Sequence, residues 1–266
     1  MIIKIGGSVL TDKKREEIVF RENVIKNICD ELGQLYSNGY RFILVHGAGS
    51  AGHVPVKRHK LYLGITSKDK LIPLTSTQNL VNKLRQKVLE YLEKSGVPAV
   101  MFYPSSLIVQ RRGRIIYFFS ESIRRFYETG FVPVLSGDMV ADLDDNIRIS
   151  VCSGDQIVFK LAEIFASKQI IFGVDVDGIY RDFGKPTQAV IERITYSEAW
   201  KTIMEVGESK AIDVTGGMKG KLGEALSHSE FFKRGGEVWV MNFTKPGTLL
   251  RAIEDGSGVF TRIVPG

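Results

Sequence analysis

Glycine-containing turns recur directly after short apolar segments of this chain, and they restrict its possible folds more than any other feature. The five turns are Gly6-Gly7-Ser8, Gly47 to Gly52, Ser136-Gly137-Asp138, Ser153-Gly154-Asp155 and Asp175 to Gly178. Ordinary tight connections between strands and helices explain one or two such turns, but not five. In open parallel sheets, ligands bind beyond the carboxyl ends of the strands. The turns therefore favour a sheet that gathers ligand-binding groups along one edge.

The apolar segments themselves predict strands that alternate with helices. Strands are expected at residues 2–5, 40–46, 98–103, 131–135, 147–152, 169–174, 237–242 and 258–264. Helical spacing of apolar residues predicts helices at 21–37, 76–94, 155–167 and 217–234. This alternation, with strands apolar on both faces, is typical of a parallel sheet between helical layers. Because no repeat or linker divides the 266 residues, we predict one continuous α/β domain, residues 1–266.

Composition favours a cytoplasmic protein with no membrane partner. The longest apolar runs, such as residues 41–45, are too short to cross a bilayer, and the first residues lack the zones of a signal peptide. The two cysteines, Cys29 and Cys152, form no disulfide framework. Since Cys29 falls on the apolar side of a predicted helix, we expect both to be buried thiols in a reducing compartment.

A net charge of +6 is compatible with nucleic acids, anionic membranes or polyanionic small molecules as partners. The basic residues are scattered, apart from Arg111-Arg112-Gly113-Arg114. That cluster lies between two apolar runs, which predicts the tip of a β-hairpin. We therefore expect no nucleic acid as partner and favour a polyanionic small molecule; the resemblance described below implies that this partner is a small phosphorylated substrate.

Residues 47–52 match the glycine pattern of dinucleotide-binding sites, but their surroundings do not. Residues 53–60, which include Pro55, do not form an amphipathic helical pattern. A second strand ending in an acidic residue about 20 positions on is also missing. A Walker A loop is absent from the sequence. What remains is a pair of glycine-rich loops whose backbone amides suit phosphate oxygens.

Phosphoryl transfer also needs positive charge around the moving group. The candidates are Lys4, Lys13 and Lys221. Lys4 interrupts an apolar strand just before a glycine turn, and Lys221 follows Gly216-Gly217, which can open a helix. Asp155 opens a helix after a strand, so it either caps that helix or orients two of the lysines.

The ordered set of motifs resembles the amino acid kinase superfamily. The set comprises Lys4-Ile5-Gly6-Gly7-Ser8, the second glycine loop, Gly137-Asp138, Ser153-Gly154-Asp155, Asp175 to Tyr180 and Thr215-Gly216-Gly217-Met218. The resemblance implies the amino acid kinase fold, with a mainly parallel central sheet between helical layers. It also implies that residues 1–150 bind the acceptor and residues 151–266 bind ATP, which carries magnesium with it. Most members assemble as homodimers through helices of the N-terminal half.

Two details are similar to isopentenyl phosphate kinases: Thr11-Asp12-Lys13, and the stretch His46 to His53. The resemblance implies catalytic roles for Lys4, Lys13, His53, Asp155 and Lys221. It implies ATP-binding roles for Lys4, Gly6, Gly7, Ser8, Gly49, Asp175, Asp177, Gly178, Tyr180, Gly217 and Lys221. It implies acceptor-binding roles for Gly47, Ala48, Gly52, His53, Gly137, Ser153 and Gly154. No metal-ligating protein residue is expected, and His46 is expected to have a packing and hydrogen-bonding role.

The implied reaction is ATP-dependent conversion of isopentenyl phosphate to isopentenyl diphosphate. An acceptor phosphate is mostly dianionic at pH 7, so it needs no general base, and a histidine beside it offsets charge repulsion. One position departs from the family pattern, since Ala51 stands where a phenylalanine is usual, and we expect a larger acceptor pocket there. The alternatives are a kinase for another phosphate or phosphonate such as fosfomycin, a catalytically silent nucleotide sensor, and a nucleic-acid-binding module.

Overall fold

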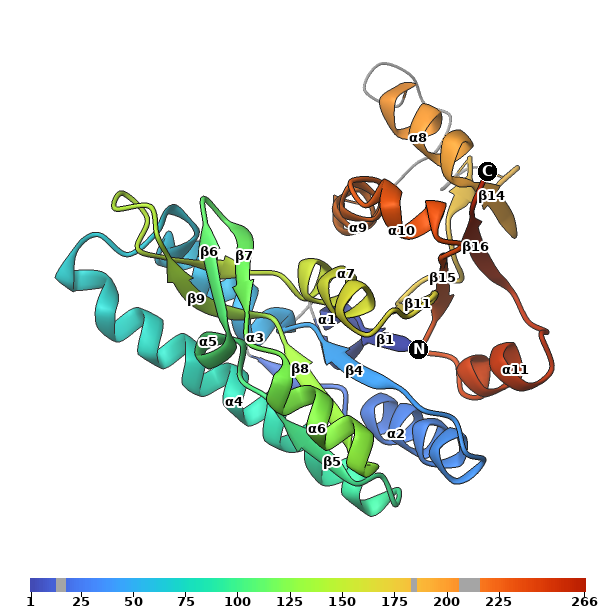
Figure 1. Ribbon diagram of the computed structural model, residues 1–266, viewed down its shortest axis with the longest axis horizontal. Helices are drawn as coiled ribbons and strands as arrows, with labels where there is room; N and C mark the ends of the chain where they lie inside the picture. Colours follow the sequence, from blue (N-terminus) through green and yellow to red (C-terminus); the bar gives the residue numbers. More distant parts are fainter. Residues whose placement is uncertain (13–17, 183–185, 206–215) are drawn as a thin grey trace.

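An eight-stranded sheet runs through the computed structural model, which describes residues 1–12, 18–182, 186–205 and 216–266 (Figure 1). Its strands, in spatial order, are β14 (Arg193–Thr195), β16 (Phe260–Val264), β15 (Glu237–Asn242), β11 (Gln169–Val174), β1 (Ile2–Ile5), β4 (Ile43–His46), β8 (Val132–Ser136) and β5 (Ala99–Met101). β1 pairs in parallel with β11 and β4, whereas β15 and β16 are antiparallel. The predicted mainly parallel sheet is confirmed.

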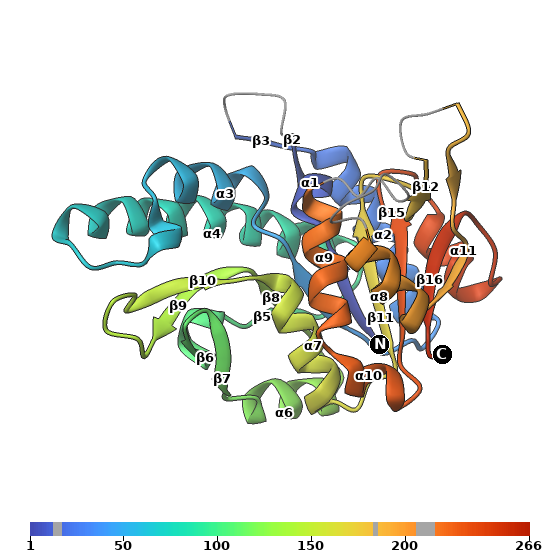
Figure 2. The same cartoon turned by 90° about the horizontal axis from the view of Figure 1, so that it is seen from above.

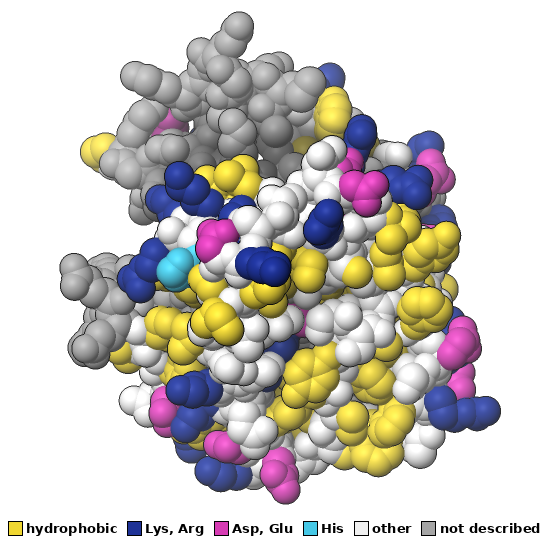
Figure 3. Space-filling model, turned by 90° about the vertical axis from the view of Figure 1, so that its left-hand side faces the viewer, with side chains coloured by type: hydrophobic (Ala, Val, Ile, Leu, Met, Phe, Trp, Pro, Cys, Tyr) yellow, Lys and Arg dark blue, Asp and Glu magenta, His cyan; other side chains and the backbone are white. Residues whose placement is uncertain are grey.

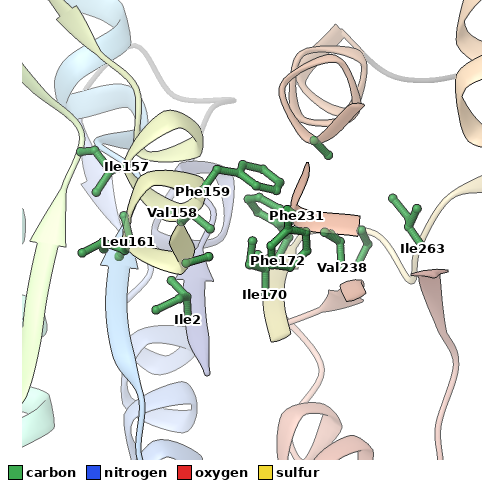
Figure 4. Close-up of a cluster of buried hydrophobic side chains, with 14 of the residues drawn as sticks. Ile2, Ile157, Val158, Phe159, Leu161, Ile170, Phe172, Phe231, Val238 and Ile263 are labelled. Carbon is green, nitrogen blue, oxygen red and sulfur yellow. The ribbon is translucent and has the colours of Figure 1, made fainter. Parts of the chain in front are cut away.

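Helices cover both faces of this sheet. One face packs against α2 (Glu22–Ser37), α4 (Leu71–Lys94) and α11 (Thr248–Glu254), and the other against α6 (Glu121–Thr129), α7 (Gly154–Ile164), α9 (Gly216–Leu226) and α10 (Ser229–Lys233). Strand side chains alternate between the faces. In β1, Ile2 joins the α7 side, shown in Figure 4, and Ile3 the α2 side. Lys4 therefore shares the α7 side with Ile2.

A second, four-stranded sheet corrects one strand assignment. It contains β10 (Ile149–Cys152), β9 (Asp138–Asp142), β6 (Ile108–Arg111) and β7 (Arg114–Phe118) in that order. The segment predicted at 147–152 is β10, and it pairs antiparallel with β9 instead of joining the parallel sheet. Only residues 143–148 separate these two strands, and a parallel connection needs a crossover of about a dozen residues.

The basic cluster forms the hairpin tip that its sequence predicts. Arg112 and Gly113 join β6 to β7 with φ angles of 52° and 72°, as a two-residue hairpin turn requires. Figure 3 shows one face of the molecule, on which Lys and Arg side chains are interspersed with apolar and acidic ones. The charge is thus dispersed on that face.

Residues after the second glycine loop form a helix that sequence analysis did not predict. α3 spans Gly49–Arg58 and packs against α4. Pro55 lies inside it and is buried, while Gly52 N–H donates to Ala48 O at 3.2 Å and His59 N–H to Pro55 O at 2.9 Å. Tertiary packing overrides the weak local propensity, since burial of one helix face contributes more than the single hydrogen bond that proline removes.

The remaining predicted helices agree with the structure except near the C-terminus. The segment predicted at 217–234 is divided at residues 227–228 into α9 and α10, and the His228 ring stacks on Phe159 with centroids 4.4 Å apart. α8 (Tyr196–Glu205) packs beside α9. Shorter elements are α1 (Gly7–Leu10), β2 (Thr11–Asp12), β3 (Val19–Phe20), η1 (Leu61–Leu63), η2 (Lys68–Lys70), α5 (Pro104–Leu107), β12 (Tyr180–Arg181) and β13 (Ala189–Val190).

Both cysteines are buried free thiols, as predicted. Burial raises the pKa of Cys29 to about 12 and that of Cys152 still further. Within the described ranges, none of the helices has the length and apolar character needed to span a bilayer.

Candidate functional site

A cavity of about 140 Å³ lies where four of the five predicted turns converge. Figure 2 shows α3 and α4 extending past the end of the main sheet, with β9 and β10 beside them. The cavity is lined by Lys4, Gly7, Gly47, Ala48, Gly52, His53, Val56, Thr77, Gln78, Val81, Gly137, Asp138, Met139, Val151, Cys152, Ser153, Gly154, Asp155 and Lys221. Its apolar lining comes from α3, α4, β9 and β10, and its lysines from β1 and α9. The chamber thus combines a cationic wall with an apolar one.

A largely buried carboxylate joins two of the three predicted lysines. Asp155, in the first turn of α7, forms an ion pair with Lys4 through one oxygen and lies 3.8 Å from Lys221 Nζ through the other. Lys4 is 4% exposed. The helix is capped instead by Ser153, whose Oγ accepts from Gln156 N–H at 3.3 Å. Asp155 therefore orients the lysines and does not cap α7. Of the two roles that the sequence left open for Asp155, the structure supports the orientation of lysines.

Burial and the neighbouring charges together set the protonation of this pair. It lowers the pKa of Lys4 to about 8, although the Asp155 carboxylate opposes the shift. Burial would raise the pKa of Asp155, but the charges of Lys4 and Lys221 outweigh it and hold that pKa below its usual range. Asp155 is thus ionised at neutral pH, while Lys4 lies close to its own titration point.

If Lys4 contacts ATP and the site takes a phosphate acceptor, as the resemblance to amino acid kinases implies, kcat/KM for ATP should fall as the pH rises above about 8, the pKa of Lys4. The protonated amine attracts phosphate, and kcat/KM reports the ionisation of the free enzyme. ATP bound at Lys4 would favour the charged amine, so the fall in kcat should come at higher pH. The acceptor phosphate titrates near pH 6, and initial rates between pH 7 and 10 therefore isolate the lysine. Asp155→Asn should move this fall in kcat/KM to lower pH, because it removes the charge that raises the pKa of Lys4. A kcat/KM that stays constant up to about pH 9.5 would contradict the assignment of the fall to Lys4.

The two glycine loops pack directly against each other. A Cβ on Gly7 would lie 2.5 Å from the backbone nitrogen of Gly49, and one on Gly47 would lie 2.5 Å from that of Gly7. Thr11 Oγ1 fastens the contact, since it donates to Gly7 O at 3.0 Å and accepts from Ser50 N–H at 2.8 Å. The loops thus form one continuous wall and do not face each other across a gap, as two separate phosphate nests would.

Gly7→Ala is expected to destabilise the protein by about 1–3 kcal/mol, because its methyl group would overlap backbone that cannot rotate away. Thermal unfolding followed by circular dichroism measures the loss. Gly223→Ala is the matched control, since a Cβ there meets no atom within 4 Å in helix α9. Equal melting temperatures for Gly7→Ala and the parent would refute the predicted close approach.

His53 lies on α3, where its exposed side chain lines the cavity. Its charge is one of the influences that lower the pKa of Asp155, so the two side chains share one electrostatic environment. Ala51 is fully buried and does not belong to the lining. The expectation of a larger acceptor pocket at Ala51 is therefore wrong, because this face of α3 points into the protein and not into the cavity.

His46 has the packing and hydrogen-bonding role that its place at a strand end predicts. It is fully buried, and its Nδ1 lies 3.1 Å from Gly47 O. Burial, together with the charges of Arg85 and Lys4, lowers the pKa of His46 to about 4. The ring is thus neutral at pH 7 and supports the turn at Gly47 without adding charge.

The acidic turn after β11 lies apart from this cavity. Asp177 accepts from Asn242 Nδ2 at 2.9 Å and forms an ion pair with Lys245 at 2.6 Å. Burial would raise its pKa, but these partners keep it below its usual value. Gly178 packs against Thr261, whose Oγ1 would lie 2.5 Å from a Cβ at that position. The turn is therefore a second polar cluster, at the ends of β11 and β15.

The structure sorts the predicted residues into three groups. Eleven line the cavity: Lys4, Gly7, Gly47, Ala48, Gly52, His53, Gly137, Ser153, Gly154, Asp155 and Lys221. Gly6, Ser8, Gly49, Asp175, Asp177, Gly178 and Tyr180 are described but do not line it, and Gly217 is the second residue of α9. Lys13 lies outside the described residues.

Sequence analysis missed the apolar half of the cavity and the partners of the acidic turn. Thr77 and Val81 belong to the predicted helix 76–94, but helical spacing alone did not indicate that these side chains line the cavity. Val56 sits in the helix that was not predicted. In β10, Ile149 and Val151 alternate with Ser150 and Cys152, and this period-two pattern would have indicated a strand with two different faces.

Comparisons with known proteins agree with this geometry. The profile described as "Amino acid kinase family" matches residues 1–240. The isopentenyl phosphate kinase of Methanothermobacter thermautotrophicus is 34% identical over 95% of this chain and 94% of its own length. That of Methanocaldococcus jannaschii is 33% identical over 83% of this chain and 84% of its own. A solved isopentenyl phosphate kinase structure superposes with a TM-score of 0.81 at 32% identity, covering 98% of this chain and 99% of that one.

Proposed function

Because the chain belongs to the amino acid kinase family, we propose that it transfers the γ-phosphoryl group of ATP to isopentenyl phosphate, forming isopentenyl diphosphate and ADP. The main support for this reaction is the cavity, which combines the Lys4–Asp155–Lys221 cluster and His53 with an apolar wall. An acceptor with a phosphate head and a short hydrocarbon tail suits both linings. The similar isopentenyl phosphate kinases favour this acceptor over fosfomycin.

In the proposed reaction, an oxygen of the acceptor phosphate attacks the γ-phosphorus. A new P–O bond forms, the bond from the γ-phosphorus to the β-phosphate oxygen breaks, and ADP leaves. No proton has to be removed, because the acceptor phosphate is already mostly dianionic. Catalysis therefore depends on positioning and on donors that offset the accumulating negative charge.

The donors in this proposal are Lys4, Lys221 and His53. Asp155 fixes both lysines on one side of the cavity, which spares the cost of ordering them during the reaction. We assign His53 to the acceptor phosphate because it lies on α3 in the N-terminal half, next to Gly52 and Ala48. We also assign Lys13 to the reacting phosphates, only because Thr11-Asp12-Lys13 resembles the corresponding motif of isopentenyl phosphate kinases.

The tail of the acceptor is proposed to lie against Val56, Val81, Met139 and Val151. These side chains come from α3, α4, β9 and β10 and form the apolar part of the cavity lining. Burial of a hydrocarbon tail there is favourable by about 25 cal/mol per Å² of apolar surface. A carboxylated or nucleoside acceptor would find few hydrogen-bonding partners at this wall.

We assign ATP to the half formed by residues 151–266, with Asp175, Asp177, Gly178, Tyr180 and Gly217 around the nucleotide. Magnesium bound to the nucleotide would offset part of the phosphate charge. Among the residues that the structure describes, His, Cys, Asp and Glu form no group of three or more that could hold a metal ion. We therefore propose that magnesium arrives with ATP, held chiefly by the phosphates.

A panel of acceptors tests the proposed function. Isopentenyl phosphate, dimethylallyl phosphate, fosfomycin, UMP and acetylglutamate are assayed for ADP release, with mass spectrometry of the products. We expect the highest kcat/KM with isopentenyl phosphate and a diphosphate product. Fast turnover with acetylglutamate alone would refute a phosphate acceptor, and preference for fosfomycin would refute the isopentenyl group.

We also propose that the enzyme is a cytoplasmic homodimer. The free thiols of Cys29 and Cys152 suit a reducing compartment.

Apolar side chains exposed along β7 and just after it suit contact with a second copy of the chain. They are Ile116, Tyr117 and Phe119, whose exposed fractions are 41–65%. Analytical ultracentrifugation tests the assembly, and a single species with the monomer mass of 29.7 kDa at micromolar concentration would exclude it.

A further inference from the structure

A buried arginine lies directly behind the cavity wall. Arg85, on α4, is 2% exposed. Its Nε donates to Ser136 Oγ at 2.7 Å and its Nη1 to Asn82 Oδ1 at 2.7 Å. Its Nη2 lies 3.0 Å from Asp138 Oδ2, and the guanidinium carbon lies 5.0 Å from the Tyr103 ring centre. Such a fully engaged guanidinium is held in one orientation.

The carboxylate that Arg85 contacts belongs to the cavity itself. Asp138 lines the cavity together with Gly137 and Met139, and its side chain is only 2% exposed. One oxygen accepts from Met139 N–H at 2.9 Å, and the other from Ser105 N–H at 3.2 Å. Among the described residues, Arg85 is the cation in contact with this carboxylate.

The negative charge of Asp138 at the cavity is unfavourable for binding an anionic acceptor, unless a positive charge compensates it. The cavity has to admit an anionic acceptor close to the γ-phosphate, and Asp155 already contributes one negative charge that two lysines offset. A second buried carboxylate would repel the acceptor phosphate strongly, because solvent screening is weak there. Arg85 supplies the compensating charge from behind the wall and does not itself line the cavity.

We propose that Arg85 is a positioning residue for the acceptor, which neutralises Asp138 and fixes the turn from Ser136 to Asp138 so that this wall accepts a phosphate. The inference rests on the proposed function, because it assumes a phosphate acceptor in this cavity. The turn also abuts the start of α7, since a Cβ on Gly137 would lie 3.5 Å from Gly154 N. The arginine thus acts on the acceptor side of the site, through Asp138 and Gly137.

A double-mutant cycle tests the proposal through KM for the acceptor. Arg85→Gln leaves an uncompensated carboxylate, so we expect KM for isopentenyl phosphate to rise at least 20-fold while KM for ATP changes less than threefold. Asp138→Asn alone should change either KM less than fivefold. In the Arg85→Gln/Asp138→Asn variant the charge is gone, and KM for the acceptor should return to within fivefold of the parent.

Arg124→Gln is the matched control for loss of a partly buried arginine. Arg124 donates to Ile164 O at 3.0 Å and lies over Phe165, away from the cavity lining. It should lower the melting temperature without raising KM for the acceptor. Equal increases in both KM values for Arg85→Gln, or no recovery in the double variant, would overturn the proposal.

Two further measurements keep the test decisive. If Arg85→Gln does not fold, the double variant decides alone: an acceptor KM within fivefold of the parent supports the proposal, and a rise above 20-fold overturns it. If the parent fails to phosphorylate isopentenyl phosphate, the proposed function fails before any variant is compared. The affinity for inorganic phosphate, measured by calorimetry in the same four proteins, then reads the charge effect directly, with the same loss and recovery expected.

Discussion

Lys4→Met is expected to lower kcat by about 10²–10³-fold, the usual cost of removing one preorganised donor from a charge-stabilising site. Lys4 Nζ is held on the cavity side of β1 by Asp155, and the side chain is almost completely buried. Water therefore cannot replace it easily as a partner for the transferring phosphate. Methionine keeps most of the side-chain volume without the charge. Steady-state rates with ATP and isopentenyl phosphate measure the effect.

A second variant separates catalysis from stability in this experiment. Lys4→Met leaves Asp155 with Lys221 at 3.8 Å, and breaking a buried ion pair destabilises a protein. Lys4→Met/Asp155→Asn removes both charges and should recover the melting temperature of the parent, yet remain as slow as Lys4→Met. If the double variant regained the parent's kcat, Lys4 would be structural and our assignment would be wrong.

The cationic side of the site could be predicted from local sequence patterns. A lysine within an apolar strand, next to a glycine turn, must either pair inside the protein or disrupt it. Period-two alternation places Lys4 on the same face as Ile2, and α7 covers that face. An aspartate in the first turn of the covering helix is then within reach. The Lys4–Asp155 pair was predictable because strand register and helix start are both local features.

The apolar side of the site was not predictable in the same way. α3 carries glycines and Pro55, and its helical state depends on packing against α4. β9 begins and ends with aspartates, Asp138 and Asp142, so its sequence reads as a polar loop. Arg85 likewise resembles a solvated residue on an amphipathic helix until Ser136 and Asp138 are brought to it. These features arise from contacts between residues distant in sequence, which periodicity does not report.

His53→Ala is expected to lower kcat by about 10²-fold while the affinity for ATP stays within twofold of the parent. The reason is location: His53 lines the cavity from α3, together with Gly52 and Ala48, and its charge acts on Asp155 of the lysine cluster. If His53 donates to the acceptor phosphate, its loss removes positive charge where two phosphates approach each other. A loss of about 100-fold in kcat is the usual cost of removing one such donor. Single-turnover rates and ATP titration by calorimetry separate the two quantities.

His59→Ala provides the control, because His59 is an exposed histidine at the end of the same helix and does not line the cavity. Its kcat should remain within twofold of the parent. His53→Gln, which retains a hydrogen-bond donor without a titratable ring, should recover part of the rate lost in His53→Ala. A kcat for His53→Ala within threefold of the parent would remove His53 from the mechanism. A parallel loss of ATP affinity would instead move its role from the acceptor to the nucleotide, because a donor that contacts only the acceptor leaves ATP binding unchanged.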